Sequence, residues 1–488
     1  MRLLWHDNQI MRRFRRTTLI TMGCLAVLAG IGLSRKVSMD FGWWLALFTP
    51  ALLLFKNKNT LSLLLVIILG LGIGLWRGCI YMQKQAVLKS LTGRNIVIEA
   101  TARTDSVYSN KSQLEFTVSG VHLLEPETGP LAGTFKISGF GVPMVYRGDT
   151  VQISGKLYPM RGSNQAHIAY AKLQVMRTGG QTIEALTRKF SVGMQNSLPE
   201  PQASFALGLL VGQRTNLPAD IITQLTMVGL VHIVAVSGYN LTIIVRGIQR
   251  LKIRSKYQKT VLSLALILVF LVVTGFSASI VRAAVISGLS LWAWYYGRSL
   301  RPLLLIAFAA AATGLANPFY VWSDLGWYLS FLAFFGVLII APLITSRLFA
   351  KLPKLLILVL IETLCAEIMT LPLIMMVFGQ MSLVALLANL IIVPLVPAAM
   401  LLGALAALGG AILPQVSGWL AWPAQLLLTY MLDIIHLLAG IPSIFLHISI
   451  SPTLMISLYA IVLILIFSLR RRTKTPNLTA ENTLNMLK

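Results

Sequence analysis

Residues 60–77 read Thr60-Leu-Ser-Leu-Leu-Leu-Val-Ile-Ile-Leu-Gly-Leu-Gly-Ile-Gly-Leu-Trp-Arg77, with no charged residue before the last position. A helix needs about 20 mostly apolar residues to cross the hydrocarbon core of a bilayer. The run is therefore typical of a membrane-spanning helix. Similar apolar runs recur along most of the 488 residues.

The composition of the whole chain supports the same interpretation. Hydrophobic residues make up 56% of the chain and charged residues only 12%, whereas soluble proteins carry about 25% charged residues. This excludes a soluble enzyme and a disordered chain, and it predicts a polytopic α-helical membrane protein. We expect about 12 spans, some of them broken helices. The runs are 17–34, 41–55, 60–77, 203–249, 260–276, 280–297, 302–316, 325–344, 355–377, 382–408, 418–440 and 449–469.

One stretch interrupts the apolar runs. Between about 89 and 178, polar and apolar residues alternate, as in Asn95-Ile-Val-Ile-Glu-Ala-Thr-Ala102 and Thr150-Val-Gln-Ile-Ser-Gly-Lys-Leu157. Alternation with a period of two, bounded by Gly, Asn and Pro, predicts short strands. About five strands in this length favour a small all-β barrel similar to an OB-fold. A fragment of a β-sandwich is the alternative.

These patterns divide the chain into five parts. An amphipathic helix is predicted after the β domain, because Ile183, Leu186, Phe190 and Met194 recur at helical spacing. Such a helix is typical of a membrane surface. The parts are a three-span segment at 1–88, the β domain at 89–180, the interfacial helix at 181–200, a second transmembrane domain at 201–472 and a tail at 473–488.

The formal net charge of +25 follows a topological pattern. Cytoplasmic loops of membrane proteins carry an excess of Lys and Arg. We therefore expect a multi-pass protein of the cytoplasmic (inner) membrane, with both termini cytoplasmic and residues 89–180 extracytoplasmic. The uncharged turn at 409–417 gives no information about its side. The segments that are rich in Lys and Arg and hold no acidic residue are 11–16, 56–58, 246–259, 298–301, 347–354 and 470–474.

Few polar residues fall at membrane depth, where each is costly and often functional. They either pair with one another to fix helix packing or mark a polar pathway. Gly and Pro interrupt the apolar runs, most densely at 208–240, and broken helices in a membrane are tolerated where they line a cavity. The polar residues in question are His232, Arg282, Asp324, Glu362, Glu367, Asp433 and His436, with Arg214 and Asp220 near a span end.

Signals for catalysis or for a cofactor are weak. The three cysteines form no CxxC pair and the six histidines are scattered, so we expect no metal, no cofactor and no enzymatic activity. No P-loop pattern is present. As an alternative, Ser237 and Gly238 together with His436 resemble the Ser–His pair of rhomboid-type intramembrane proteases, although Ala235 stands where that motif has Gly.

The segment His232-Ile-Val-Ala-Val-Ser-Gly-Tyr-Asn240 resembles the signature of the ComEC competence family, membrane channels for DNA uptake. Further elements occur in the family's order along the chain, and Gln213 replaces the usual acid in the first of them. The resemblance covers about 200–470 and extends to the N-terminal β domain. The matching elements are Gly212–Arg214, Ser279–Ala283, Asn317-Pro318, Asp324, Leu329–Phe331, Leu371-Pro372, Phe378-Gly379 and Ala388–Pro394.

The resemblance implies a channel that translocates single-stranded DNA into the cytoplasm during natural transformation. Many family members continue with a metallo-β-lactamase-like nuclease domain, whose HxHxDH motif this sequence lacks. We therefore expect a form without that domain. The implied partners are single-stranded DNA, a cytoplasmic DNA motor or helicase, an outer DNA receptor, a separate nuclease and the lipid membrane. A transporter of another anionic polymer, or of a lipid-linked substrate, is the alternative.

Candidate site residues follow from this resemblance. Arg282 and Arg214 are the candidates for phosphate contact, and Asp324, Glu362 and Glu367 are assigned to gating or charge pairing. The complete DNA pathway is expected to contain Arg214, His232, Ser237, Gly238, Asn240, Arg282, Asn317 and Asn389.

In the β domain, basic residues among aromatic ones favour contact with single-stranded DNA. The alternative is that the aromatic side chains form the core of the barrel. These aromatic residues are Tyr108, Phe116, Phe135, Phe140, Tyr146, Tyr158 and Tyr170.

Overall fold

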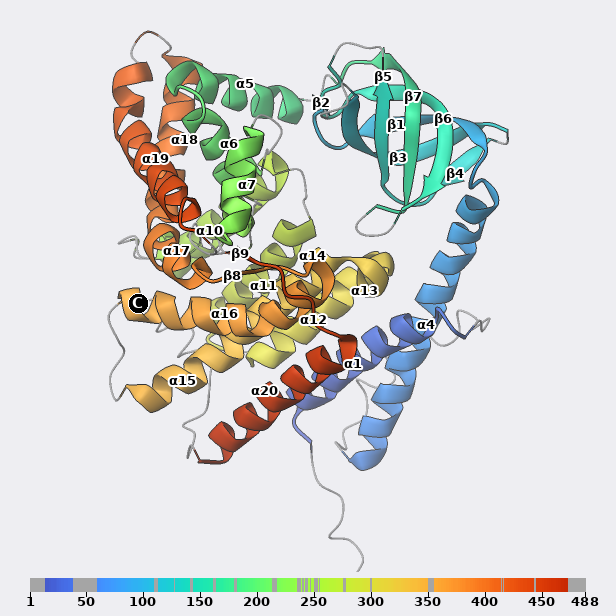
Figure 1. The fold of residues 1–488 in the computed structure, drawn as a ribbon. Coiled ribbons are helices and arrows are strands. Elements are labelled where there is room, and N and C mark those ends of the chain that lie inside the picture. The colour runs from blue at the N-terminus through green and yellow to red at the C-terminus, as the bar shows by residue number, and fades with distance from the viewer. Residues whose placement is uncertain are drawn as a thin grey trace, which may run out of the picture.

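A helical body and a β domain make up the molecule, and the long helix α4 (Thr60–Ser90) leads from one to the other (Figure 1). The computed structural model describes residues 14–37, 59–108, 113–126, 128–140, 144–160, 164–179, 182–212, 217–234, 238, 241, 245, 247–249, 253, 255–274, 278–298, 301–349, 355–413, 415, 417–442 and 445–472.

Eight helical segments of the described residues are long and apolar enough to span a membrane, so the chain is a multi-pass membrane protein. They are Arg16–Leu33 (α1), Thr60–Ser90 (α4), Ala278–Tyr295 (α11), Leu325–Leu348 (α14, η1 and α15), Ile357–Phe378 (in α16), Ala385–Ile412 (α17, η2 and α18), Ser417–Ala439 (α19) and Pro452–Leu469 (in α20).

Two of these segments, Leu325–Leu348 and Ala385–Ile412, change helix type along their length. Their parts, together with α16 and α20, are α14 (Leu325–Phe335), the π-helical turn η1 (Gly336–Ile340), α15 (Ala341–Leu348), α16 (Leu355–Phe378), α17 (Ala385–Ile392), the 3-10 turn η2 (Val393–Leu395), α18 (Val396–Ile412) and α20 (Pro452–Arg472).

The expectation of about 12 spans is wrong, since the described residues supply eight. The interrupted run at 203–249 forms short helices: α6 (Gln202–Val211), α7 (Ala219–Met227) and α8 (Val231–Val234). In α6 every residue after the first is buried, so its apolar character reflects burial in protein, not exposure to lipid. The run at 302–316 is also short, as α12 (Pro302–Ala316), and α10 (Lys256–Val273) is not among the eight. The run at 41–55 lies outside the described residues.

The segment after the β domain forms helix α5 (Thr182–Ser197), which packs along the C-terminal half of α18. A side chain at Gly193 would collide with the backbone of Ala407 and Ala411, so the two helices approach closely there. The Ser197 hydroxyl donates to the Ala406 carbonyl at 2.9 Å. The predicted position of α5 at a membrane surface stays a prediction.

The β domain is one sheet of seven strands whose ends meet. Strand β1 pairs with both β6 and β3, which closes the order β1-β6-β7-β5-β3 into a barrel. The β5–β7 pair is parallel, and the short strands β2 and β4 each pair antiparallel with β3. The strands are β1 (Asn95–Ala102), β2 (Val107–Tyr108), β3 (Leu114–Glu125), β4 (Gly129–Leu131), β5 (Phe135–Phe140), β6 (Thr150–Pro159) and β7 (Ala166–Arg177).

Alternation in the sequence explains this barrel. The predicted strands at 95–102 and 150–157 are present, and the apolar residues of each point inward. Phe135, Ile137 and Ile153 have no exposed surface, and they belong to one core cluster that also includes Leu88 from the end of α4. The helix and the barrel therefore share a core where they join.

Three further contacts hold the barrel against the helical body. The Gln165 amide donates to the Tyr81 hydroxyl of α4 at 3.0 Å. Arg147 donates to the Val272 carbonyl near the end of α10 at 3.5 Å. The Arg188 guanidinium of α5 lies 4.4 Å from the ring centre of Tyr146. The β domain thus contacts helices from distant parts of the chain.

Candidate functional site

A cavity of about 1020 Å³ lies within the helical body. Its wall combines α11, α14, α16 and α17 with the segment around α8 and with β8 (Met381–Ser382), which pairs with β9 (Phe445–Leu446). Most lining residues are apolar. The polar ones are Thr226, His232, Gln249, Ser279, Arg282, Ser287, Ser290, Ser330, Glu362, Thr363, Glu367, Thr370, Gln380, Ser382 and Asn389.

Arg282 of α11 is the one Arg or Lys among the described residues that line the cavity. Its side chain is 2% exposed, and its Nη2 donates to the Gly326 carbonyl at 3.0 Å. Its Nε and Nη1 have no hydrogen-bond partner. A buried donor without a partner is costly, and a guanidinium with free N–H groups is suited to bind an anion through two hydrogen bonds.

Asp324 and Arg282 both form hydrogen bonds with the backbone of Gly326. Its carboxylate accepts from the backbone N–H groups of Gly326 at 2.9 Å and Trp327 at 3.3 Å, and so caps the N-terminus of α14. Arg282 binds the carbonyl of that same Gly326. Asp324 is not among the lining residues. In the structure it positions the start of α14, whereas the gating or pairing role assigned from the sequence stays a prediction.

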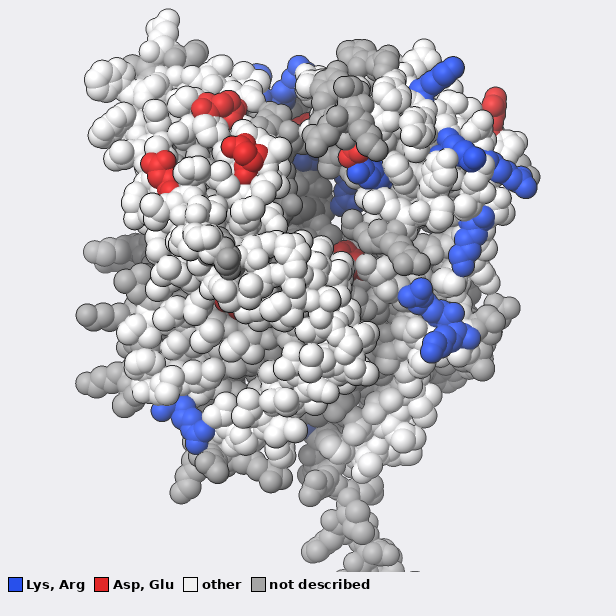
Figure 2. Space-filling model, viewed as in Figure 1, with Lys and Arg blue, Asp and Glu red and all other residues white. Residues whose placement is uncertain are grey.

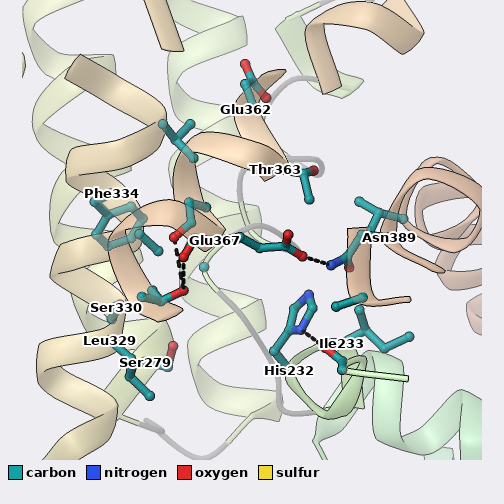
Figure 3. A pocket seen from close by; sticks show the side chains of 18 of the residues that line it. His232, Ile233, Ser279, Leu329, Ser330, Phe334, Glu362, Thr363, Glu367 and Asn389 are labelled. Carbon is teal, nitrogen blue, oxygen red and sulfur yellow. Dashed lines mark hydrogen bonds between the residues drawn. The ribbon is translucent and has the colours of Figure 1, made fainter. Parts of the chain in front are cut away.

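Two carboxylates come from one face of α16. Glu362, Thr363, Glu367 and Thr370 all line the cavity, with the spacing of residues that share one side of a helix. The Asn389 amide of α17 donates to the Glu367 carboxylate at 2.5 Å. Figure 3 shows these two side chains pointing toward one another, with Glu362 further along α16. Asn389 is 2% exposed, and its Oδ1 has no partner.

His232 also lines the cavity. In Figure 3 it lies on the side of the Glu367–Asn389 pair that faces away from Glu362. Its Nδ1 lies 3.1 Å from the carbonyl of Gly229. Gly229 has φ +76°, a backbone conformation that would be strained in a residue with a side chain. Gly238 also lines the cavity, and a side chain there would press on Ala283 and Phe334. The motif around 232–240 thus places its glycine, Gly238, against α11 and α14.

Other predicted site residues lie elsewhere or outside the described chain. Asn317 accepts from the Phe319 backbone N–H at 3.1 Å, beside α13 (Phe319–Ser323), and does not line the cavity. Arg214, Ser237 and Asn240 lie outside the described residues. His436 of α19 contacts Gln224 of α7 at 3.1 Å and is likewise not a lining residue.

The polar lining also includes residues that the sequence reading missed. Thr363 and Thr370 share a helical face with the two acids of α16, and Ser279, Ser287 and Ser290 lie on α11 with Arg282. Helical spacing from each intramembrane charge would have identified them. Gln249 is helical and Ser382 belongs to the two-residue strand β8, and neither is at helical spacing from one of these charges.

On the β domain, Phe140 and Tyr170 form a stacked pair, with ring centres 6.4 Å apart and planes inclined by 26°. Tyr170 is 73% exposed and has φ +53°, which is rare for a residue other than Gly. It lies where β7 bulges against β5. The exposed Lys172 is opposite Phe140, and the exposed Lys156 lies 5.9 Å from the ring of Tyr158.

The predicted aromatic residues of the β domain therefore fall into two groups. Phe116 and Phe135 are core residues. The exposed or half-exposed ones are Phe140, Tyr146, Tyr158 and Tyr170. The side chain of Tyr108 lies outside the described part. Figure 2 shows Lys and Arg over the β domain and α4, and acidic residues over the opposite part of the helical body.

The β domain also contains a histidine, His167, whose pKa is shifted. His167 of β7 is 2.9 Å from the Ser138 hydroxyl, beside the ion pair of Lys136 with Glu115 at 2.7 Å. Burial lowers the pKa of His167 below its ordinary value of 6.5, and the neighbouring Lys136 ammonium lowers it further. The neutral imidazole is therefore favoured in the folded domain.

Comparison with known proteins adds an independent observation. A family model described as Competence protein matches residues 209–473, more than half of the chain. ComE operon protein 3 of Bacillus subtilis (strain 168) is 27% identical over 223 residues, which are 45% of this chain and 28% of that relative. The match therefore spans less than a third of the relative. No solved structure matches.

The region matched by the family model contains every lining residue of the cavity, from Thr226 to Phe445. It also contains the motifs around 232–240 and 279–283 that resemble ComEC. The chain belongs to the competence protein family, the ComEC family of membrane proteins.

Proposed function

We propose that the protein is an inner-membrane channel that passes single-stranded DNA into the cytoplasm during natural transformation. Membership of the family implies a role in DNA uptake. The observation that carries the proposal is Arg282, a buried arginine with two unpartnered guanidinium nitrogens in the wall of the cavity. DNA phosphates are the anions that these donors would bind.

The rest of the cavity wall is consistent with transport. Single-stranded DNA carries one negative charge per nucleotide, which hydrocarbon does not accept, so donors must replace water along its path. Arg282 supplies such donors at one point. The mostly apolar remainder of the wall offers the bases few strong hydrogen bonds, and weak binding favours onward movement.

The β domain would bind the strand before it reaches the cavity. Its closed barrel and its parallel β5–β7 pair support an OB-like fold. The exposed Phe140–Tyr170 pair, with Lys172 and Lys156 nearby, has the properties of a surface on which bases stack and phosphates are neutralised. We place this domain outside the membrane and both termini in the cytoplasm, as the charge pattern predicts.

Import of an anion requires work. Against an inside-negative membrane potential, each charge costs about 2.3 kcal/mol per 100 mV. A cytoplasmic DNA motor or helicase would supply the pulling force, and an outer DNA receptor would deliver the strand. A separate nuclease would remove its complement. The match covers only 28% of the relative's length, so we propose these partners from the mechanism and not from the relative.

The test is the Arg282→Ala variant in a competent strain. We expect the protein to accumulate and insert normally and transformation to be abolished, while DNA still reaches a nuclease-protected state outside the inner membrane. Arg282→Lys should transform only in part, since it keeps the charge but loses the planar fork of donors. The His232→Ala variant should share the defect.

A matched control separates a local effect from a general loss of positive charge. Arg298 is exposed just beyond the end of α11 and does not line the cavity. Arg298→Ala should transform like wild type. If Arg282→Ala also transforms like wild type at normal protein level, Arg282 is a packing residue and the proposed pathway is wrong.

The mostly apolar wall also supports a second candidate, a transporter of a lipid-linked anionic substrate or of another anionic polymer. DNA uptake in a deletion strain distinguishes the two, because only the DNA channel predicts its loss. The rhomboid-type protease alternative would instead require that Ser237→Ala stop processing of a membrane-protein substrate while DNA uptake continues.

A further inference from the structure

The wall of the cavity that α16 forms is acidic, which a simple DNA conduit does not require. Glu362 and Glu367 both line the cavity. They are five residues apart, so they are displaced by about 7.5 Å along the helix axis. Carboxylates repel phosphates, so these two groups must serve something other than phosphate binding.

The Glu367–Asn389 pair has an unused acceptor. Asn389 donates its amide N–H to Glu367, while its Oδ1 is buried and has no partner. The Glu367 carboxylate has no ion pair with any residue in the described part of the chain. The cavity thus holds a carboxylate and an amide oxygen, and no cationic side chain of the described residues forms an ion pair with that carboxylate. A proton on Glu367 would neutralise the carboxylate and provide an O–H that the Asn389 oxygen can accept.

The other titratable groups around Glu367 are limited among the described residues. Glu362, His232 and Arg282 face the same cavity, from α16, α8 and α11. Tyr459 of α20 donates to the Met369 carbonyl on α16. Tyr328 of α14 donates to the Val321 carbonyl, and Arg347 of α15 is exposed. Arg282 donates to the Gly326 carbonyl, which fixes part of its guanidinium at α14.

We propose that Glu367 and Glu362 form a proton relay that couples inward proton movement to passage of the DNA strand. The inference rests on the proposed function. A proton from external water adds to the Glu367 carboxylate, and the Asn389 amide turns its oxygen to accept the new O–H. The proton then passes through cavity water to Glu362 and is released to cytoplasmic water. Only O–H bonds form and break, and no oxidant or reductant is needed.

The direction follows from the position of the acids on α16. The basic segment at 347–354 precedes α16, and the positive-inside pattern assigns it to the cytoplasm. Glu362 is therefore closer to the cytoplasm than Glu367. One proton per nucleotide would cancel the charge of the phosphate, and the proton gradient would then contribute to import.

The experiment uses the full chain in vesicles of phosphatidylethanolamine and phosphatidylglycerol, with a pH-sensitive dye inside and an acidic buffer outside. Addition of oligothymidylate should acidify the lumen in the wild type. Glu367→Gln should lose this acidification and still bind the oligonucleotide, because its amide oxygen can still accept from Asn389 and the cavity stays intact. Glu367→Asp, which keeps a carboxyl group, should retain part of the signal.

A matched control uses another acid of a spanning helix. Asp433 of α19 is exposed and does not line the cavity, so Asp433→Asn should acidify the lumen like wild type. Passage of oligonucleotide into the lumen without acidification would overturn the relay, as would normal acidification by Glu367→Gln.

Failure of the channel itself gives a different result. A deletion strain that still takes up DNA contradicts the proposed function. A deletion strain that has lost uptake, restored to wild-type transformation by Glu367→Gln, contradicts only the proton relay.

Discussion

The β domain and the helical body bury apolar residues according to different rules. In β1, Ile96, Ile98 and Ala100 are buried between more exposed neighbours, as the alternation in the sequence predicts. In the helical body, α6 is almost entirely buried, whereas the span Pro452–Leu469 has no buried residue, and both are strongly apolar. A domain in water separates its two faces by polarity. Lipid and protein interior are both apolar, so hydropathy does not distinguish them.

The largest expected effect concerns the side of the membrane on which the α18–α19 turn lies. Because α5 follows the β domain and packs on the end of α18, we expect Gln415, which is exposed, to lie on the same side as the β domain. A Gln415→Cys variant should react fully with a membrane-impermeant maleimide in intact cells without their outer wall. Gly129→Cys should react equally, and a reporter after Lys488 should be cytoplasmic, which requires that α19 and α20 together carry the chain across the membrane once.

The wild-type chain, with Cys79 and Cys365 buried, is the background for this labelling. Reaction of position 415 only after lysis would show that the packing of α5 does not report the side of the turn. A cytoplasmic Gly129 would overturn the whole charge-based topology.

The next effect concerns two residues of one strand. Phe135 and Phe140 are the ends of β5, and the first has no exposed surface while the second is 46% exposed. Phe135→Ala should lower the free energy of unfolding of the isolated domain 89–180 by about 3–5 kcal/mol, as measured by denaturant titration. Phe140→Ala should leave it nearly unchanged. Equal losses would mean that the exposed face contributes as much to stability as the core.

The third effect concerns DNA binding by the same domain. Isolated 89–180 should bind single-stranded DNA weakly, with an affinity that falls as salt rises. Tyr170→Ala should weaken binding by about 1–3 kcal/mol, because it removes one stacking surface. Fluorescence anisotropy with an oligothymidylate measures this. Met176→Ala, an exposed residue of the same strand, is the control. No detectable binding at low salt would leave the domain a structural role only.

The smallest effect is a pH dependence of the same domain. Burial lowers the pKa of His167 in the folded state, so the unfolded chain binds the proton more readily. The resulting stability is fully present above pH 6.5, the ordinary pKa, and is lost as the pH falls through the folded pKa. Thermal unfolding should show a lower melting temperature in acid, and His167→Gln should flatten this slope. An unchanged slope in the variant would assign the pH dependence to other groups.

Part of the candidate site follows from the sequence alone. The structure brings His232, Gly238, Arg282, Glu367 and Asn389 to one cavity, although they are far apart in the chain. Most of these residues could be identified from the sequence because few polar residues fall within apolar runs.

Asn317 and Asp324 have a different position for a local reason. Each accepts backbone N–H groups at the start of a helix, Asn317 from Phe319 and Asp324 from Gly326 and Trp327. Asn and Asp are favoured at such starts, so a capping residue and a pathway residue look alike in a sequence. The helix that follows each of them was the signal that could have separated the two roles.

Composition, period-two alternation and ordered motifs are local properties, so they were enough to predict the class of the protein, the strands of the β domain and the family. The number of spans was overestimated, because an apolar run such as 203–211 has the same composition whether lipid or protein surrounds it. The contact of Glu367 with Asn389 and the two unpartnered donors of Arg282 could be found only in the folded structure. Such contacts join residues that are distant in the chain, and their geometry depends on how whole helices pack.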